Sequence, residues 1–178
     1  MMDIRKCAPD RIALMMLALM FMPIWAHAQT PAASTGSGNP DRYHGQGYVF
    51  AAPGAYVGYS ETRATMHFGA GGEALVYKGL GAGAEIGGIW AIQGSDLLAV
   101  FSADGSYHFS RDREVSPFLV GGYSRIWGDG SANLVNFGGG VNWWLGERKG
   151  IRLEFRDHIY AEGSNRHIVE FRIGFAFR

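Results

Sequence analysis

Histidine is the residue type in this chain whose chemistry could most directly make a site, because imidazole ligates metals and transfers protons near neutral pH. His67, His108 and His158 lie far apart in the sequence. Three scattered histidines are weak evidence for a metal centre. We expect all three to belong to one polar network inside the fold, including His158, which follows Asp157 in the sequence. No metal is predicted.

Glycine-rich segments are the second candidate, because a glycine loop can hold the phosphates of a cofactor. Residues 69–72 and 138–140 are glycine-rich, but no Gly-Lys-Ser/Thr follows either segment, and neither opens a helix. We therefore predict no cofactor.

Charged side chains recur at every second position near the C-terminus, as in Arg152, Glu154 and Arg156, and again in Glu170 and Arg172. A period of two places all of them on one face of a β-strand. On adjacent strands they would form a ladder of ion pairs. We predict that one polar face, enclosed in a lumen, carries Glu73, Glu85, Asp104, Arg152, Glu154, Arg156, His158, Glu170 and Arg172.

The last stretch of the chain, 167–178, shows this period most clearly. Val169, Phe171, Ile173, Phe175 and Phe177 alternate with polar or small residues. Such a strand, in a chain with an export signal, is typical of a transmembrane barrel.

The same alternation predicts eight strands, at 47–57, 65–76, 80–91, 97–109, 115–127, 134–145, 150–160 and 167–178. The fold predicted is all-β: an eight-stranded antiparallel up-and-down transmembrane β-barrel, because each strand is long enough to cross a bilayer when tilted. Pro53 interrupts the first strand, since proline lacks an N–H. The fifth alternates poorly, and its faces are not assigned.

The connections between these strands alternate in length. Segments 58–64, 91–96, 128–133 and 161–166 are predicted as outer loops, and 77–79, 110–114 and 146–149 as tight turns. This rhythm places both termini of the barrel at the periplasmic end.

The N-terminus predicts export. Basic residues precede an apolar run over 12–25, and Ala26-His27-Ala28 forms a small-x-small cleavage site, as in a secretory signal peptide. Residues 1–28 are therefore predicted as a signal peptide cleaved after Ala28, 29–44 as a flexible segment, and 45–178 as the outer membrane barrel domain. Cys7, the only cysteine, leaves with the signal.

The formal net charge is zero, which gives no electrostatic case for nucleic acid as a partner. No apolar run after the signal approaches the length of a spanning helix. If the mature chain lies in a membrane, it must do so as a closed sheet, because backbone groups in lipid need internal partners.

Alternation alone does not decide which face looks outward, since a soluble lipocalin-like barrel turns its apolar face inward. Charges of both signs on the polar face favour an enclosed, paired interior. Aromatic residues near the strand ends resemble interfacial girdles: Trp90, Tyr107, Phe109, Trp127, Trp143, Tyr160 and Phe177. The predicted lipid-facing residues are Phe101, Phe137, Val141, Leu153, Phe155, Phe171, Ile173, Phe175 and Phe177.

Three runs carry a resemblance: Phe137-Gly-Gly-Gly-Val-Asn-Trp-Trp-Leu145, Gly150-Ile-Arg-Leu-Glu-Phe-Arg-Asp-His158 and Glu170-Phe-Arg-Ile-Gly-Phe-Ala-Phe177. Together they resemble the closing half of small outer membrane barrels, a group similar to the transmembrane domain of outer membrane protein A and its single-domain porin-like relatives. The resemblance covers about residues 45–178 and implies outer membrane lipid and the barrel assembly machinery as partners. Such chains usually end on the aromatic residue, whereas this one adds Arg178.

Some barrels of this group are lipid-modifying enzymes, such as lipid A deacylases, which would need a lipid-facing histidine with a serine two residues on. His158 is followed by Ile159 and Tyr160, and Ser164 lies in a loop, so the pattern is not met. An eight-stranded lumen is filled by side chains, which argues against a diffusion channel. We expect a monomeric outer membrane barrel with a structural or surface-interaction role, a polar lumen, no catalytic site and possible ligand contacts at the outer loops. The alternatives are a lipid-modifying enzyme and a soluble exported barrel that binds an apolar ligand.

Overall fold

The computed structural model describes residues 44–92, 96–110, 113–162 and 165–178 of the chain. The predicted signal peptide, its cleavage site at Ala26 and Ala28, and all of the predicted leader except His44 lie outside the described residues.

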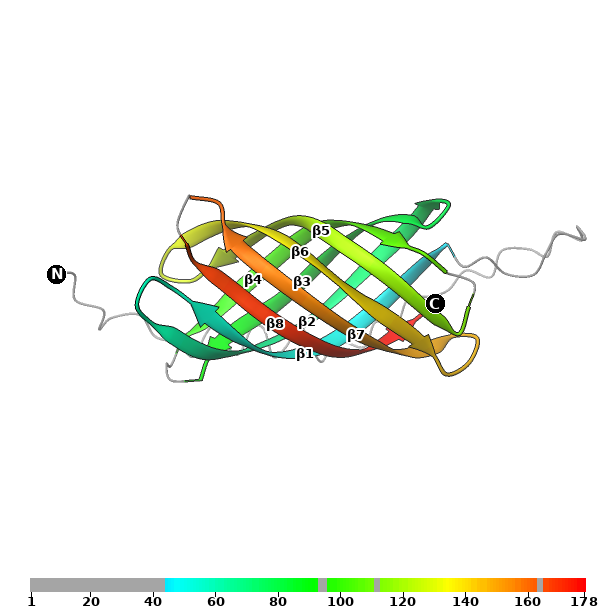
Figure 1. Ribbon diagram of the computed structural model, residues 1–178, viewed down its shortest axis with the longest axis horizontal. Coiled ribbons are helices and arrows are strands. Elements are labelled where there is room, and N and C mark those ends of the chain that lie inside the picture. The colour runs from blue at the N-terminus through cyan, green and yellow to red at the C-terminus, as the bar shows by residue number, and fades with distance from the viewer. Residues whose placement is uncertain (1–43, 93–95, 111–112, 163–164) are drawn as a thin grey trace, which may run out of the picture. The chain divides into compact units, whose positions relative to one another are not determined.

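Eight strands form one closed antiparallel barrel in which each strand pairs with the next and β8 pairs with β1 (Figure 1). The predicted fold is confirmed. The strands are β1 (Gly45–Val57), β2 (Thr62–Tyr77), β3 (Leu80–Ala91), β4 (Leu97–His108), β5 (Val115–Trp127), β6 (Ser131–Trp144), β7 (Lys149–Tyr160) and β8 (His167–Phe177). Strands β3 and β5 have the predicted bounds, whereas β2 and β6 each begin three residues earlier than predicted.

Pro53 lies inside β1 rather than at its edge. It stands opposite Met66 of β2. The pairing between β1 and β8 runs as far as Ala51 opposite Ile173 and resumes only at Gly54 opposite Glu170. The register is the same on both sides of this interruption. A proline without an N–H is thus accommodated where the ladder on one side is broken.

The two ends of the barrel differ in their connections. The start of β1 and the end of β8 lie at one end, called here the termini end, with the turns 78–79, 109–114 and 145–148 (Figure 1). The other end, called the loop end, carries 58–61, 92–96, 128–130 and 161–166. Because β2 and β6 extend further than predicted, two of the predicted outer loops are shorter, and the expected difference in length between the ends is small.

The turn between β2 and β3 shows why glycine stands at position 79. Lys78 has a φ of 42° and Gly79 a φ of 92°. Two consecutive residues with positive φ are the geometry of a tight two-residue hairpin, and glycine adopts it without steric cost. A Cβ on Gly79 would lie 2.4 Å from the backbone oxygen of His108.

Side chains alternate between the inside and the outside of the barrel along every strand. In β8, Phe171, Ile173 and Phe175 are exposed outside, while Glu170 and Arg172 are buried inside. The faces of β5 are now defined: Ser116, Phe118, Val120, Ser124 and Ile126 are buried, and the residues between them face out or are partly buried. The soluble alternative needs the reverse arrangement, with the phenylalanines enclosed.

Among the described residues, no helix has the length and apolar character needed to span a bilayer.

Candidate functional site

Glu85 of β3 lies at the centre of the charged interior. Its carboxylate accepts hydrogen bonds from the hydroxyl of Tyr48 at 2.7 Å, from Nη1 of Arg156 at 2.9 Å and from Nη1 of Arg172 at 2.8 Å. Strands β7 and β8 are not neighbours of β3, so these bonds cross the lumen. Glu85 therefore ties opposite walls of the barrel together.

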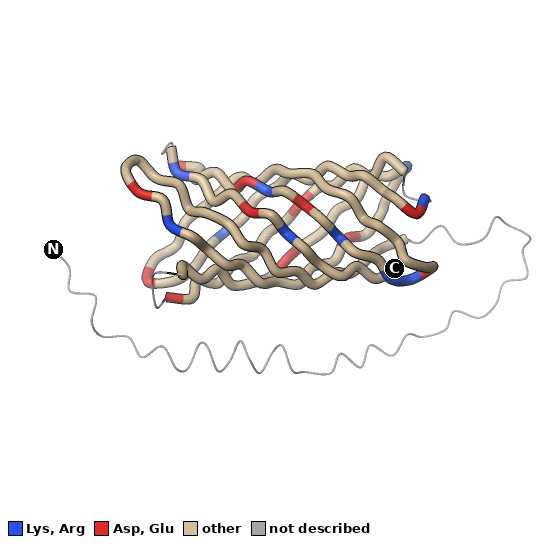
Figure 2. The backbone as a smooth tube through the Cα atoms, turned by 60° about the horizontal axis from the view of Figure 1, so that its bottom comes forward, with Lys and Arg blue, Asp and Glu red and all other residues tan. Residues whose placement is uncertain are grey.

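The arginines of β7 and β8 also pair along their own strands. Arg152 and Arg156 both donate to Glu154, and Arg172 donates to Glu170 at 2.9 Å. Residues two apart share a face of a strand, which permits such pairs. Figure 2 shows charged positions of both signs along the wall as well as at the ends of the barrel.

The charged residues of the predicted ladder on β7 and β8 pair along their strands, across the lumen and, at longer distance, across the two strands. The register does place Glu154 opposite Arg172 and Arg156 opposite Glu170. Across the two strands, Arg172 lies 3.8 Å from Glu154 and His158 lies 3.7 Å from Glu170, and the shorter carboxylate bonds of the arginines run along the strands or across the lumen. A long guanidinium reaches inward to Glu85 and Asp104, which leaves fewer donors for the neighbouring strand.

A second cluster surrounds Glu73 of β2, nearer the termini end. The carboxylate accepts hydrogen bonds from Gln46 and Ser106, and lies 2.9 Å from Nε2 of His108 and 3.8 Å from Nη1 of Arg152. Every one of these side chains is buried. Glu73 is therefore bonded to groups on three other strands.

The three histidines of the polar face are buried members of these networks. Nδ1 of His67 lies 3.0 Å from Glu170, and Nδ1 of His158 lies 3.1 Å from the hydroxyl of Ser124. Nη2 of Arg172 lies 3.1 Å from Nε2 of His158. In the part of the chain that the structure describes, no group of three or more histidine, cysteine or acidic residues is placed to hold a metal ion.

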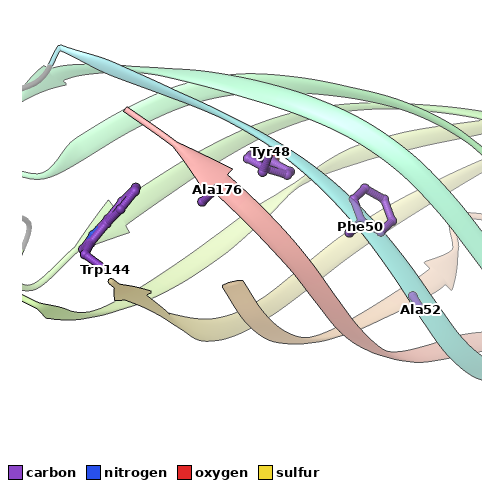
Figure 3. Packing of buried hydrophobic residues seen from close by; sticks show 5 residues of the cluster. All are labelled: Tyr48, Phe50, Ala52, Trp144 and Ala176. Carbon is purple, nitrogen blue, oxygen red and sulfur yellow. The ribbon is translucent and has the colours of Figure 1, made fainter. Parts of the chain in front are cut away.

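The sequence predicted a polar lumen, but the observed lumen is not polar throughout. An aromatic layer lies toward the termini end. The guanidinium of Arg152 is sandwiched between the rings of Tyr48 and Phe118, 4.2 and 3.9 Å from their centroids. Tyr48, Phe50, Ala52, Trp144 and Ala176 form a buried cluster, in which Trp144 and Tyr48 project into the barrel (Figure 3).

Arg178, the residue added after the terminal phenylalanine, covers this layer. Its guanidinium lies 4.3 Å from the ring centroid of Trp144, and its Nε donates to the backbone oxygen of Glu147 at 2.7 Å. The backbone N–H of Arg178 also donates to the oxygen of Arg148. The extra residue is thus attached to the β6–β7 turn.

A second apolar layer closes the loop end. Ile89, Val100, Ile126, Leu134 and Ile168 are buried together inside the barrel, with Tyr56 and Tyr160 packed against them. The rings of Tyr56 and Tyr160 meet edge to face at 6.2 Å. Tyr160 was predicted to belong to the outer aromatic girdle, but it faces the lumen, because it has the same parity in β7 as His158.

Small residues in the wall make room for the large interior groups. Gly71 is the clearest case, since a Cβ there would lie 2.8 Å from Glu85 and 2.8 Å from the ring of Tyr48. The hydrogen bond between Tyr48 and Glu85 therefore depends on the missing side chain at position 71.

The side chains predicted to face lipid all lie on the outside of the barrel. Val141 and Leu153 are partly buried, and the others are exposed: Phe101, Phe137, Phe155, Phe171, Ile173, Phe175 and Phe177. An outer wall of this composition suits the hydrocarbon core of a bilayer.

One pair of polar residues on the outer wall was not predicted. Asp157 of β7 and His167 of β8 face outward, with Oδ2 of Asp157 3.1 Å from Nδ1 of His167. A signal was present in the sequence, since Asp157 breaks the apolar face of its strand and His167 has the parity of Val169. What the sequence did not provide was the register that brings the two together.

No protein-family model matches the chain, and no curated protein matches it. Several solved structures do match the chain. Neisserial surface protein A is 12% identical with a TM-score of 0.62, over 76% of this chain and 97% of that one. Ail, the attachment invasion locus protein of Yersinia pestis, is 9% identical with a TM-score of 0.53, over 75% and 96%. The outer membrane enzyme PagL is 15% identical with a TM-score of 0.52, over 74% and 99%.

These similarities define the fold: this chain is built like the small eight-stranded barrels of the bacterial outer membrane, as the sequence resemblance predicted. At 9–15% identity, the likeness shows the fold. The same fold serves a surface protein, an attachment protein and an enzyme, so it does not by itself assign a function.

Proposed function

We propose that this chain is a closed structural barrel of the bacterial outer membrane, with a lumen filled by its own side chains and short loops that offer contacts at the cell surface. The observation that carries the proposal is the interior itself. Glu85, Arg156 and Arg172 join opposite walls across the lumen. A barrel joined in this way has no free path for solutes.

The two apolar layers support the same proposal. The Trp144 layer lies on one side of the ionic network and the Ile168 layer on the other. An ion crossing the barrel would have to leave water and pass both layers, and transfer of a charge into apolar surroundings is strongly unfavourable. The barrel is thus suited to anchoring and contact rather than to transport.

The partners that fit this role are outer membrane lipid around the apolar wall, the barrel assembly machinery during insertion, and a surface ligand at the loop end. Tyr59, in the loop 58–61, is 76% exposed, and it offers an aromatic contact at that end. The proposal has the chain acting as a monomer, exported by its N-terminal signal, with the loop end outside the cell.

Conductance of the purified chain in planar bilayers tests this function. Insertion is established first by heat-modifiable migration in detergent gels, which folded barrels show. We expect an inserted barrel without regular conductance steps. Reproducible unitary steps from the folded protein would contradict the closed lumen.

Lipid-ester hydrolysis is a second candidate, and the Asp157–His167 pair is the observation that favours it. A histidine oriented by a carboxylate is the usual form of a general base, and this one faces the lipid side. The second position after His167 is Val169, so the pair lacks the serine that a deacylase of this fold would use.

Release of fatty acid from phospholipid and from lipid A by the purified barrel separates the two candidates. If the chain is a closed structural barrel, the unaltered chain should release no more fatty acid than a His167→Ala variant. Release by the unaltered chain that the His167→Ala variant loses would establish the enzyme instead.

A further inference from the structure

The outward face at the loop end of β5 and β6 carries a polar patch, defined here as Tyr123, Arg125, Trp127, Ser131 and Asn133. Arg125 stands opposite Asn133, and Trp127 stands opposite Ser131 in the register. Outward positions alternate along both strands, so all five side chains share one surface outside the barrel. This patch could not be predicted from the sequence, because the faces of β5 were not assigned.

The contacts within the patch leave hydrogen-bond donors directed outward. Nη2 of Arg125 donates to the hydroxyl of Ser131 at 3.2 Å, and the guanidinium lies 5.7 Å from the ring centroid of Trp127. The hydroxyl of Tyr123 donates to Oδ1 of Asn133 at 2.6 Å. This bond fixes the amide of Asn133, so its NH2 group remains as a donor beside the guanidinium.

Arg125 has no anionic partner among the described residues, and the acidic residue nearest along the chain, Asp129 in the turn 128–130, forms no ion pair with it. By contrast with Arg125, Arg63 at the loop end of the barrel forms an ion pair with Glu61 at 2.9 Å. Arg63 has the parity of the inward-facing Thr65 and His67, so it belongs to the mouth of the barrel and not to the outer wall.

The depth of the patch identifies the kind of partner. Tyr123 and Trp127 are exposed aromatic residues at the loop end of β5, and such residues mark the headgroup level of a membrane. A guanidinium at this level, beside an amide and a hydroxyl, matches the oxygens of a phosphate, which arginine binds through two parallel N–H groups.

We propose that the patch binds the phosphate of a lipid headgroup in the leaflet that surrounds the loop end. Arg125 provides the charge, Asn133 and Ser131 provide neutral donors, and Trp127 holds the guanidinium flat against the wall. The assignment deepens the proposed function, because it rests on the barrel lying in a membrane with the apolar wall toward lipid.

Native mass spectrometry of the full chain, folded in detergent, tests the site with two lipids that differ only in phosphate: phosphatidic acid and a diacylglycerol with the same acyl chains. We expect retention of phosphatidic acid and little of diacylglycerol. Arg125→Gln should weaken the binding of phosphatidic acid about tenfold, the loss of one charge-assisted contact. Arg125→Lys, which keeps the charge without the planar fork, should lose less.

Arg63→Gln is the matched control, since it removes the same charge from the same end and should leave binding unchanged. Equal binding by Arg125→Gln and the unaltered chain would overturn the site, as would an equal loss in Arg63→Gln. Displacement of the lipid by an equal concentration of inorganic phosphate would overturn the lipid as the source. Heat-modifiable migration is read separately: a chain that never folds as a barrel would overturn the membrane role together with the site.

Discussion

Replacement of Arg156 by leucine is the perturbation with the most direct consequence for the interior. Nη1 of Arg156 donates to both Glu85 and Asp104 at 2.9 Å, and its Nε donates to Glu154. All four side chains lie inside the barrel, and Arg156 is fully buried. Leucine fills part of the volume but leaves three carboxylates without this partner.

Removal of one partner from a buried ionic group is destabilising by about 3–5 kcal/mol, because the remaining charges stay buried away from water and lose part of their pairing. With a urea dependence of about 2 kcal/mol per molar, the unfolding midpoint should fall by about 1.5–2.5 M. The matched control is Arg63→Leu, the same chemical change at an exposed pair with Glu61, where the loss should be at most about 1 kcal/mol.

The assay is urea titration of both variants in lipid vesicles, followed by tryptophan fluorescence and by heat-modifiable migration. A double-mutant cycle with Glu85→Gln isolates the contact across the lumen, since coupled residues show non-additive losses. Equal midpoints for Arg156→Leu and Arg63→Leu would refute the claim that the interior network stabilises the barrel.

Three further changes test other parts of the structure. Glu170→Leu should lower the urea midpoint more than Ser131→Ala, because Glu170 binds His67 and Arg172 in the buried interior; similar midpoints would contradict this. Gly79→Val should destabilise the barrel by about 1–3 kcal/mol, since a branched residue is strained at positive φ, whereas Lys78→Gly should be tolerated; equal effects on the midpoint would argue against the turn geometry. Arg178→Ala should cost about 1 kcal/mol through the lost contact with Trp144, and Arg178→Lys should recover part of it; an unchanged midpoint in Arg178→Ala would show that the last residue does not stabilise the termini end.

The strands and their faces could be predicted wherever alternation was strict. In β8 every second residue from Val169 is apolar, and the parity alone separates Phe171 from Arg172. In β5 the alternation failed, because Phe118, Val120 and Ile126 are apolar and buried inside the barrel while Leu119 is apolar and exposed on the outside. A strand that is apolar on both faces carries no period of two.

The partners of the charged residues could not be predicted, although their common face could. Glu85 meets Arg156 and Arg172 across the lumen, and this depends on how far the strands are staggered around the barrel. The spacing of residues within one strand determines neither the stagger between strands nor the distance that an arginine side chain reaches across the lumen. The outward pair Asp157 and His167 was missed for the same reason.

The orientation of the wall, with apolar side chains toward lipid and ionic ones inside, is the claim on which the account depends. Trp143 and Trp144 are adjacent in the sequence but lie on opposite faces of β6: Trp143 is 46% exposed outside, and Trp144 is 2% exposed inside. Two variants, each retaining one of these tryptophans with all others replaced by phenylalanine, are placed in vesicles of brominated lipid, which quenches fluorescence on contact. We predict strong quenching of Trp143 and weak quenching of Trp144; equal quenching of the two, or stronger quenching of Trp144, would contradict the account.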